Sequence, residues 1–249
     1  MKKKLIILTG PTAVGKTDLS IRLARTVGGE IISADSMQVY RRMDIGTAKI
    51  RPEEMDGVRH HLIDILEPTE SFNAFLFKEY ALKAANEIWE RGSIPIIVGG
   101  TGFYIQTLLY DIEFAKSDEN DGIRDELNKL YEEHGAAFLH DMLAKVDPEY
   151  AAEVHENNVK KVIRAIEFYR QTGHKLSEHN TEQRERTSPY NFEYFVLSDD
   201  RTVLYERIDK RIDGMVEAGL IAEVQALLDE GVDRESVAMQ GLGYKEIAS

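Results

Sequence analysis

Several short stretches of this sequence carry residue types that could do chemistry, and the first is "GPTAVGKT". It fits the pattern G-x-x-x-x-G-K-[ST], in which backbone N–H groups surround phosphate oxygens. In that pattern the lysine adds a positive charge and the hydroxyl of the last residue can bind Mg²⁺. The stretch predicts a site for a di- or triphosphate of unspecified identity, formed by Gly10, Pro11, Thr12, Ala13, Val14, Gly15, Lys16 and Thr17.

The second stretch is "SADSMQVY", residues 33–40, which follows an apolar run. If that run is a strand of a parallel sheet, Asp35 lies at its carboxyl end, where open α/β sheets bind ligands. A carboxylate at this place could bind Mg²⁺ through water or accept a proton from a substrate. Asp and Ser also cap turns and helices, so the residue types alone leave both interpretations open.

Two further stretches could complete such a site. "VGGTGFY", residues 98–104, offers the Thr101 hydroxyl in a glycine-rich turn, although a helix cap is the simpler interpretation. Arg207 and Arg211 are four residues apart and therefore share one helix face, where arginines could neutralise a departing phosphate. Acidic neighbours surround both arginines, so spacing alone favours a solvated helix face.

A basic segment, residues 157–175, contrasts with the acidic composition of the chain. It contains one acid and these basic residues: Lys160, Lys161, Arg164, Arg170 and Lys175. Such a segment could follow a nucleic-acid backbone, or it could be an ordinary solvated helix. Apolar residues in the same segment, including Val162 and Ile163, are predicted to pack inward.

Composition limits the function classes. The 249 residues are 43% hydrophobic, with a formal net charge of −13 and no cysteine. The charge argues against broad non-specific binding to nucleic acid but permits a local basic groove. Without cysteine there are no disulfides or thiolate metal sites, which fits a cytoplasmic setting. The adjacent His60 and His61 point to opposite faces of a strand and make a poor metal chelate.

The elements that must position these residues alternate along the chain. Apolar, β-branched runs predict strands at residues 4–9, 29–35, 60–65, 94–100 and 192–198. Amphipathic spacing predicts helices at residues 16–27, 72–92 and 201–219. This alternation predicts an α/β fold, a P-loop NTPase-like core whose parallel sheet is flanked by helices.

Residues 115–179 interrupt this alternation with helical patterns and no convincing strand. We therefore expect a helical insertion between two parts of the core, residues 1–114 and 180–249. The polar stretch 177–191 is expected to be a mobile connection. The N-terminal "MKKKLIILTG" is expected to be a buried strand instead of a signal peptide, because its apolar run is too short. No stretch approaches the length of a transmembrane helix.

Taken in order, these stretches resemble the tRNA dimethylallyltransferase family, also called the tRNA isopentenyltransferase family. The resemblance rests above all on "ADSMQVYRRMDIGTAK" and "VGGTGFYI". It extends over "HHLID", "VKKVIRAIEFYRQTG", "ERIDKRIDGMVEAGLIAEV" and "GLGYKE", from residue 5 to residue 246. It implies transfer of a dimethylallyl group from dimethylallyl diphosphate to adenine N6. The adenine lies on the 3′ side of the anticodon, in tRNAs that read codons beginning with U.

The resemblance also implies roles for individual residues. The loop 10–17 would hold the diphosphate, with Thr17 on Mg²⁺, while Asp35 would act as general base and Arg211 would stabilise the leaving group. Thr101 would contact both the tRNA and the diphosphate region. The remaining tRNA contacts are implied for Asp35, Ser36, Met37, Gln38, Lys160, Lys161, Val162, Ile163 and Arg164. The implied partners are tRNA and dimethylallyl diphosphate, with no membrane, and the protein is expected to be a monomer.

Three other functions share parts of this pattern. A P-loop kinase of small metabolites would consume ATP, and a related enzyme could prenylate free adenine nucleotides. A non-catalytic nucleotide-dependent binding module would not need Asp35. Members of the resembled family continue past "GLGYKE" into further helices, so we expect that the chain ending at Ser249 is shortened.

Overall fold

The computed structural model describes residues 2–113 and 122–249. The chain divides into two compact units, Met1–Asp111 with Ser188–Ser249, and Ile112–Thr187. We call the first the core unit and the second the insertion. The predicted boundary at 114–115 lies outside the described residues, and the one at 179–180 falls within a helix. No helix among the described residues is both long and apolar enough to cross a membrane.

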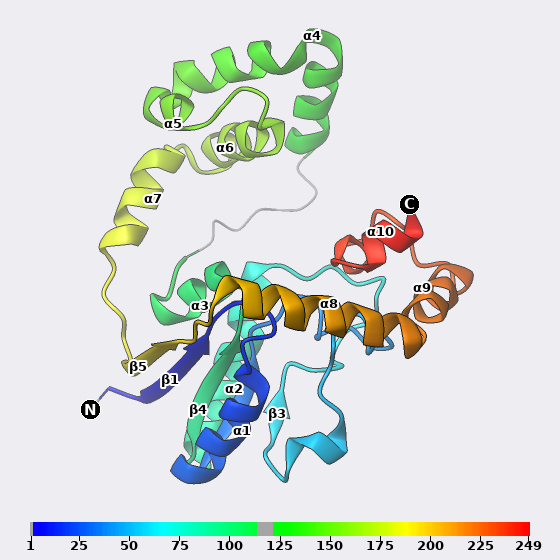
Figure 1. The fold of residues 1–249 in the computed structure, drawn as a ribbon. Helices are drawn as coiled ribbons and strands as arrows, with labels where there is room; N and C mark the ends of the chain where they lie inside the picture. The colour runs from blue at the N-terminus through cyan, green and yellow to red at the C-terminus, as the bar shows by residue number, and fades with distance from the viewer. Residues whose placement is uncertain (1, 114–121) are drawn as a thin grey trace. The chain divides into compact units, whose positions relative to one another are not determined.

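The core unit contains one five-stranded sheet, in the order β3-β2-β4-β1-β5 (Figure 1). Its strands are β1 (Lys4–Thr9), β2 (Gly29–Ser33), β3 (His60–His61), β4 (Ile94–Gly99) and β5 (Asn191–Val196). Every pairing is parallel, with Ile6 opposite Ile96 and Ile31 also opposite Ile96 on the other side. The predicted parallel α/β fold is therefore confirmed.

Further helices belong to the core unit. They are α1 (Lys16–Val27), α2 (Ala74–Glu90), α3 (Gly102–Leu109), α8 (Arg201–Glu217), α9 (Leu220–Asp229) and α10 (Tyr244–Ala248), with 3-10 turns at Pro52–Met55 and Ala238–Gln240. The crossover through α1 runs from β1 to β2, and the crossover through α2 runs in the opposite direction, from β3 to β4. Because crossovers between parallel strands are right-handed, α1 and α2 cover opposite faces of the sheet.

Burial follows from these two faces. Ile31 and Ile96 pack against Ile21 and Ala24 of α1, and all four are at most 8% exposed. Burial of each isoleucine contributes about 1.5–3 kcal/mol. On α2 a stripe three and four residues apart is also buried, comprising Phe77, Ala81, Ala84, Ala85 and Ile88. The two cores fix the sheet, and with it the loops at the carboxyl ends of its strands.

The described residues of the insertion form helices joined by short turns and contain no strand. It contains α4 (Ile123–Val146), α5 (Pro148–Glu153), α6 (Val159–Thr172) and α7 (Leu176–Glu185). Within α4 the backbone departs from helical geometry at Gly135. A small core joins the helices, and its members include Leu127, Leu139, Leu143, Val162, Ile163, Ala165, Ile166 and Leu176.

Helix α7 corrects one prediction. We expected residues 177–191 to be a mobile connection, but Leu176–Glu185 form a helix. Asp147 explains it, because this buried carboxylate accepts hydrogen bonds from the Ser177 backbone N–H at 2.9 Å and from the Ser177 hydroxyl at 2.7 Å. It also caps α5 through the Tyr150 N–H at 3.1 Å. One side chain from a distant element thus anchors the start of a polar helix.

The Asp147→Asn variant tests this anchor. Burial opposes ionisation of Asp147, but the hydrogen bonds from Ser177 and Tyr150 outweigh it and lower the pKa of the carboxyl. The amide oxygen of the variant can still accept at one position, but the amide nitrogen cannot accept the Ser177 bond at the other, so we expect the insertion to lose about 1–3 kcal/mol of stability. Amide exchange on the whole chain should show faster opening of α5 and α7, and unchanged protection there would contradict the assignment.

The pH dependence of the same anchor has a definite sign. Because the pKa of Asp147 is lower in the folded state, its contribution is present at pH values above the unfolded pKa. It is lost as the pH falls through the folded pKa. We therefore expect acidification to open α7 in the wild type and to change Asp147→Asn much less.

Candidate active site

The phosphate loop, residues 10–17, connects β1 to α1, and the side chain of its lysine folds back onto the backbone of the loop. The Lys16 Nζ donates hydrogen bonds to the carbonyl oxygens of Gly10 at 2.9 Å and Pro11 at 2.7 Å. Partial burial lowers the pKa of Lys16, while the Asp35 carboxylate raises it and Arg211 lowers it further. Thr17 is exposed at the first turn of α1. The loop thus presents a cation and a helix N-terminus to one place, which suits a phosphate group.

Asp35 follows β2 at the same edge of the sheet. Its Oδ1 accepts the backbone N–H groups of Met37 at 2.8 Å and Gln38 at 3.2 Å, which folds the loop into a tight turn. Within the described residues the other carboxylate oxygen accepts no hydrogen bond. Asp35 therefore has both the turn-forming role and a free oxygen near Lys16.

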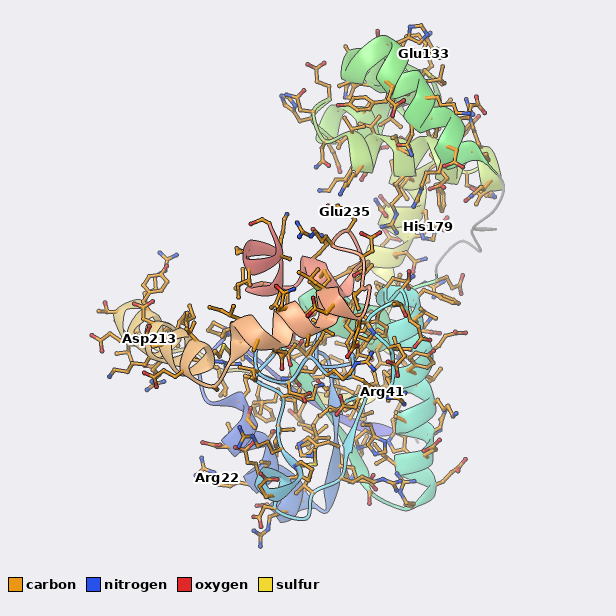
Figure 2. The ribbon with its side chains drawn as sticks, turned by 90° about the vertical axis from the view of Figure 1, so that its right-hand side faces the viewer. Arg22, Arg41, Glu133, His179, Asp213 and Glu235 are labelled. Atoms are coloured by element: carbon orange, nitrogen blue, oxygen red, sulfur yellow. The ribbon has the colours of Figure 1, made fainter. Side chains whose placement is uncertain are left out.

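Arg211 comes from α8, which runs past the carboxyl ends of the strands (Figure 1). Partial burial lowers the pKa of Arg211, and Asp35 raises it. Arg207, one turn earlier, pairs with Asp199 at 2.9 Å and donates to the Ala13 carbonyl oxygen at 3.4 Å. Asp213, in contrast, lies on the exposed surface of the helix (Figure 2). The solvated face that spacing favoured therefore holds for Arg207, whose side chain is 48% exposed, but is wrong for the half-buried Arg211.

Thr101 occupies the turn between β4 and α3. It is at the N-cap position of α3 but makes no side-chain cap hydrogen bond, so the simple cap interpretation is wrong. The preceding residues join the neighbouring strands, since the Thr9 hydroxyl donates to the Gly99 carbonyl at 2.9 Å. A Cβ on Gly99 would lie 2.4 Å from the Ala34 carbonyl oxygen. Only glycine permits this approach, which brings the Thr101 turn beside Ala34 and Asp35, while a Cβ on Gly100 would lie 3.7 Å from the Gly10 carbonyl oxygen of the phosphate loop.

Tyr104 is a residue near the site that the sequence did not single out. Its ring is buried, stacked on Phe77 with centroids 4.8 Å apart and edge-on to Phe72 at 5.6 Å. Burial and the nearby Asp35 both raise the pKa of its hydroxyl. The residue ends the stretch "VGGTGFY". Its position three residues after Thr101, on the same helix, could have indicated that it lies near the site.

The other residues implied to touch tRNA next to Asp35 have varied surroundings. Gln38 uses its amide within the loop, donating to the Thr47 carbonyl at 3.2 Å and contacting the Ser33 hydroxyl at 3.2 Å. Ser36 and Met37 are half-buried. Contacts of these three residues with tRNA remain predictions.

The basic segment belongs to the insertion. Lys160, Lys161 and Arg164 have exposed side chains on α6. Val162 and Ile163 are only 1% and 6% exposed and lie in the core of the insertion. Their side chains pack inward, so the implied contact of these two residues with tRNA has no exposed side chain to make it.

The exposed Thr17 hydroxyl in the phosphate loop is a group that could hold a metal ion. Within the described residues no three His, Cys, Asp or Glu side chains gather to hold a metal. His60 bonds to the Val58 carbonyl and His61 to Glu30, so neither forms a chelate. The exposed Thr17 hydroxyl fits Mg²⁺, which commonly keeps water ligands and binds phosphate oxygens with few protein groups.

Comparison with known proteins agrees with this geometry. A family model described as IPP transferase matches residues 38–249. The chain belongs to the IPP transferase family. Among curated relatives, the tRNA dimethylallyltransferase of Lachnoclostridium phytofermentans is 58% identical over 243 residues, covering 98% of this chain and 78% of the relative. That of Carboxydothermus hydrogenoformans is 49% identical over 247 residues, covering 99% and 79%.

Solved structures of the IPP transferase family are also similar. The full-length tRNA isopentenylpyrophosphate transferase of Bacillus halodurans has a TM-score of 0.71 and 46% identity, over 99% of this chain and 77% of that one. A eukaryotic dimethylallyltransferase acting on tRNA has a TM-score of 0.88 and 34% identity, over 99% and 62%. The predicted family and P-loop-like fold are thus confirmed.

Proposed function

We propose that this chain transfers a dimethylallyl group from dimethylallyl diphosphate to N6 of the adenine 3′-adjacent to the anticodon, releasing diphosphate. The acceptors would be tRNAs that read codons beginning with U. The observation that carries the proposal is the convergence of Lys16, Asp35 and Arg211, from three distant parts of a chain of this family. Two cations beside one carboxylate suit a reaction in which a diphosphate leaves and a proton is removed.

The residues have complementary roles in this reaction. The allylic C–O bond breaks as the N6–C bond forms, so negative charge grows on the leaving diphosphate. Lys16, Arg211 and the backbone N–H groups of the loop 10–17 stabilise that charge. Asp35 receives the proton lost by N6, a poor nucleophile whose lone pair is delocalised into the ring. The adenine must leave its stack to reach Asp35, as in other enzymes that act on a base.

Prenyl transfer from a diphosphate generally uses a divalent metal. We propose Mg²⁺, held at the Thr17 hydroxyl. When bound, the ion neutralises charge on the diphosphate oxygens. Thr101, beside the phosphate loop, would orient the diphosphate and the incoming base.

The acceptor can be tested directly by competition. The protein is incubated with labelled dimethylallyl diphosphate, Mg²⁺ and equal amounts of unmodified tRNA and AMP, with ATP consumption followed in a parallel reaction. We expect label on the tRNA alone and no ATP consumed. Label on AMP would favour a nucleotide prenyltransferase, and ATP consumption without transfer would favour a kinase.

The exposed basic residues of α6 give a second test. Replacing Lys160, Lys161 and Arg164 together by Gln should weaken the binding of tRNA to a similar degree whatever the tRNA sequence. The plot of log affinity against log salt should become shallower by roughly one unit for each lost phosphate contact. Lys129→Gln, an exposed lysine on α4, is the matched control. An unchanged salt slope in the triple variant would remove α6 from the tRNA-binding surface.

A further inference from the structure

Glu223 on α9 makes an unusual set of contacts with a distant loop. Its Oε2 accepts the backbone N–H groups of Asp44 at 2.9 Å and Ile45 at 2.8 Å. Its Oε1 accepts the N–H of Gly46 at 3.2 Å and the hydroxyl of Tyr244. A carboxylate has about four acceptor positions, and here four donors use them. The three consecutive N–H groups of residues 44–46 therefore bind an anion, and that anion is the Glu223 carboxylate.

The same turn fits closely against α9 and α10. A Cβ on Gly46 would lie 2.5 Å from the Tyr244 ring and 2.8 Å from Leu220. Tyr244 is only 1% exposed, and its burial and its bond to Glu223 raise the pKa of its hydroxyl. Only glycine permits the backbone to lie on this ring. The turn is thus held both by hydrogen bonds and by packing.

A continuous path runs from this turn to Asp35. Residues 47 and 48, immediately after the turn, accept the Gln38 side-chain amide through their carbonyl oxygens, at 3.2 and 3.5 Å. The Gln38 backbone N–H in turn donates to the Asp35 Oδ1 at 3.2 Å. The hydrogen bonds of Glu223 go to residues other than Lys16 and Asp35. Glu223 nevertheless fixes the segment to which the Asp35 turn is hydrogen-bonded through Gln38.

Ion pairs of the buried Lys49 side chain hold the same loop from within. The Lys49 side chain is 4% exposed and pairs with Asp44 at 2.6 Å and Asp64 at 2.5 Å. It also donates to the Tyr40 carbonyl oxygen at 2.7 Å. Arg41, visible on the same loop in Figure 2, donates to the Asp64 carbonyl at 2.9 Å. Ion-paired or hydrogen-bonded side chains join this loop to α9: Glu223 binds the turn 44–46, and Arg42 pairs with Glu230 at 3.3 Å at the end of the helix.

We propose that Glu223 is a positioning residue for the transfer reaction: by binding the turn 44–46 it holds the loop 35–48 so that the Asp35 carboxylate meets the acceptor nitrogen. The inference rests on the proposed function. Glu223→Gln leaves one oxygen acceptor and places an amide NH₂ against backbone N–H donors. Since a small misplacement of a catalytic group is costly, kcat should fall about 10- to 100-fold, with KM for dimethylallyl diphosphate within about twofold.

A double-mutant cycle distinguishes positioning from a general structural role. If Glu223 acts through Asp35, Glu223→Gln should lower single-turnover transfer much less in an Asp35→Asn background than in the wild type. Tyr244→Phe, which keeps the three backbone bonds, should have a smaller effect. Glu235→Gln, on an exposed loop (Figure 2), is the matched control. An equal fold loss in both backgrounds would overturn the proposal, as would unchanged kcat.

Amide exchange supplies a readout that does not need activity. Glu223→Gln should accelerate exchange at residues 44–46 and also at Met37 and Gln38, while β1 and β4 keep wild-type protection. Faster exchange confined to 44–46 would overturn the proposal, and general loss of protection would assign Glu223 to stability alone. If the wild type transfers no label at all, the proposed function fails, whereas an active wild type with an equally active Glu223→Gln refutes only this inference.

Discussion

Asp35→Asn is expected to lower kcat for transfer to tRNA by about 10²- to 10⁴-fold, the range typical for loss of a general base. The asparagine oxygen can still accept the Met37 and Gln38 N–H groups, so the turn should remain. What is lost is the ability to take the N6 proton. Affinity for dimethylallyl diphosphate should stay within about threefold, because the phosphate loop is untouched.

The measurements for this variant are kcat by label transfer and diphosphate-substrate affinity by direct titration. Asp213→Asn, an exposed carboxylate on α8, serves as the control and should behave as wild type (Figure 2). Wild-type kcat in Asp35→Asn would exclude Asp35 as the base. Complete loss of dimethylallyl diphosphate binding would instead show that Asp35 acts through the phosphate site.

Arg211→Gln is expected to lower kcat by about 10²- to 10³-fold, comparable with the loss of one preorganised donor to a developing anion. The guanidinium is partly buried, and burial already opposes its charge, so its interaction with a leaving diphosphate is poorly screened by water. Arg211→Lys keeps the charge but loses the planar fork, and should recover only part of the rate.

The split between kcat and KM decides how Arg211 acts. Stabilisation of the leaving group predicts a fall in kcat with little change in KM for tRNA. Lys210→Gln removes the exposed neighbouring cation and should leave both parameters unchanged. If Arg211→Gln instead raised KM for tRNA at unchanged kcat, Arg211 would belong to the tRNA-binding surface.

The sequence predicted the fold well, because the strands and helices that local residue patterns favour are the ones that also pack in the folded core. The apolar run 4–9, the loop 10–17 and the helix 16–27 each form within a few residues, and β1 and α1 match them. Strands and helices alternate along the chain without hairpins, and this pattern favours a parallel sheet over other arrangements of the strands. The strand predicted at 60–65 shortens to His60–His61, because the chain turns at Leu62 and Asp64, which have positive φ.

The site was only partly predictable for a different reason. The loop 10–17 is a local motif, but the approach of Arg211 to Asp35 depends on how α8 crosses the sheet, which spacing along α8 cannot report. Helix α7 was missed because its anchor, Asp147, is 30 residues earlier in the sequence than Ser177. The role of Glu223 had no signal in the sequence, because its partners are backbone N–H groups of a distant loop and the Tyr244 hydroxyl.

The most direct test of the central claim is to locate the transferred group. The wild-type protein is incubated with labelled dimethylallyl diphosphate, Mg²⁺ and unmodified tRNA, and the tRNA is digested to nucleosides and to anticodon-loop fragments. The account predicts label on N6 of the adenine 3′ to the anticodon, one diphosphate released for each group transferred, and no requirement for ATP. Label on another nucleoside, or transfer that requires ATP hydrolysis, would contradict it.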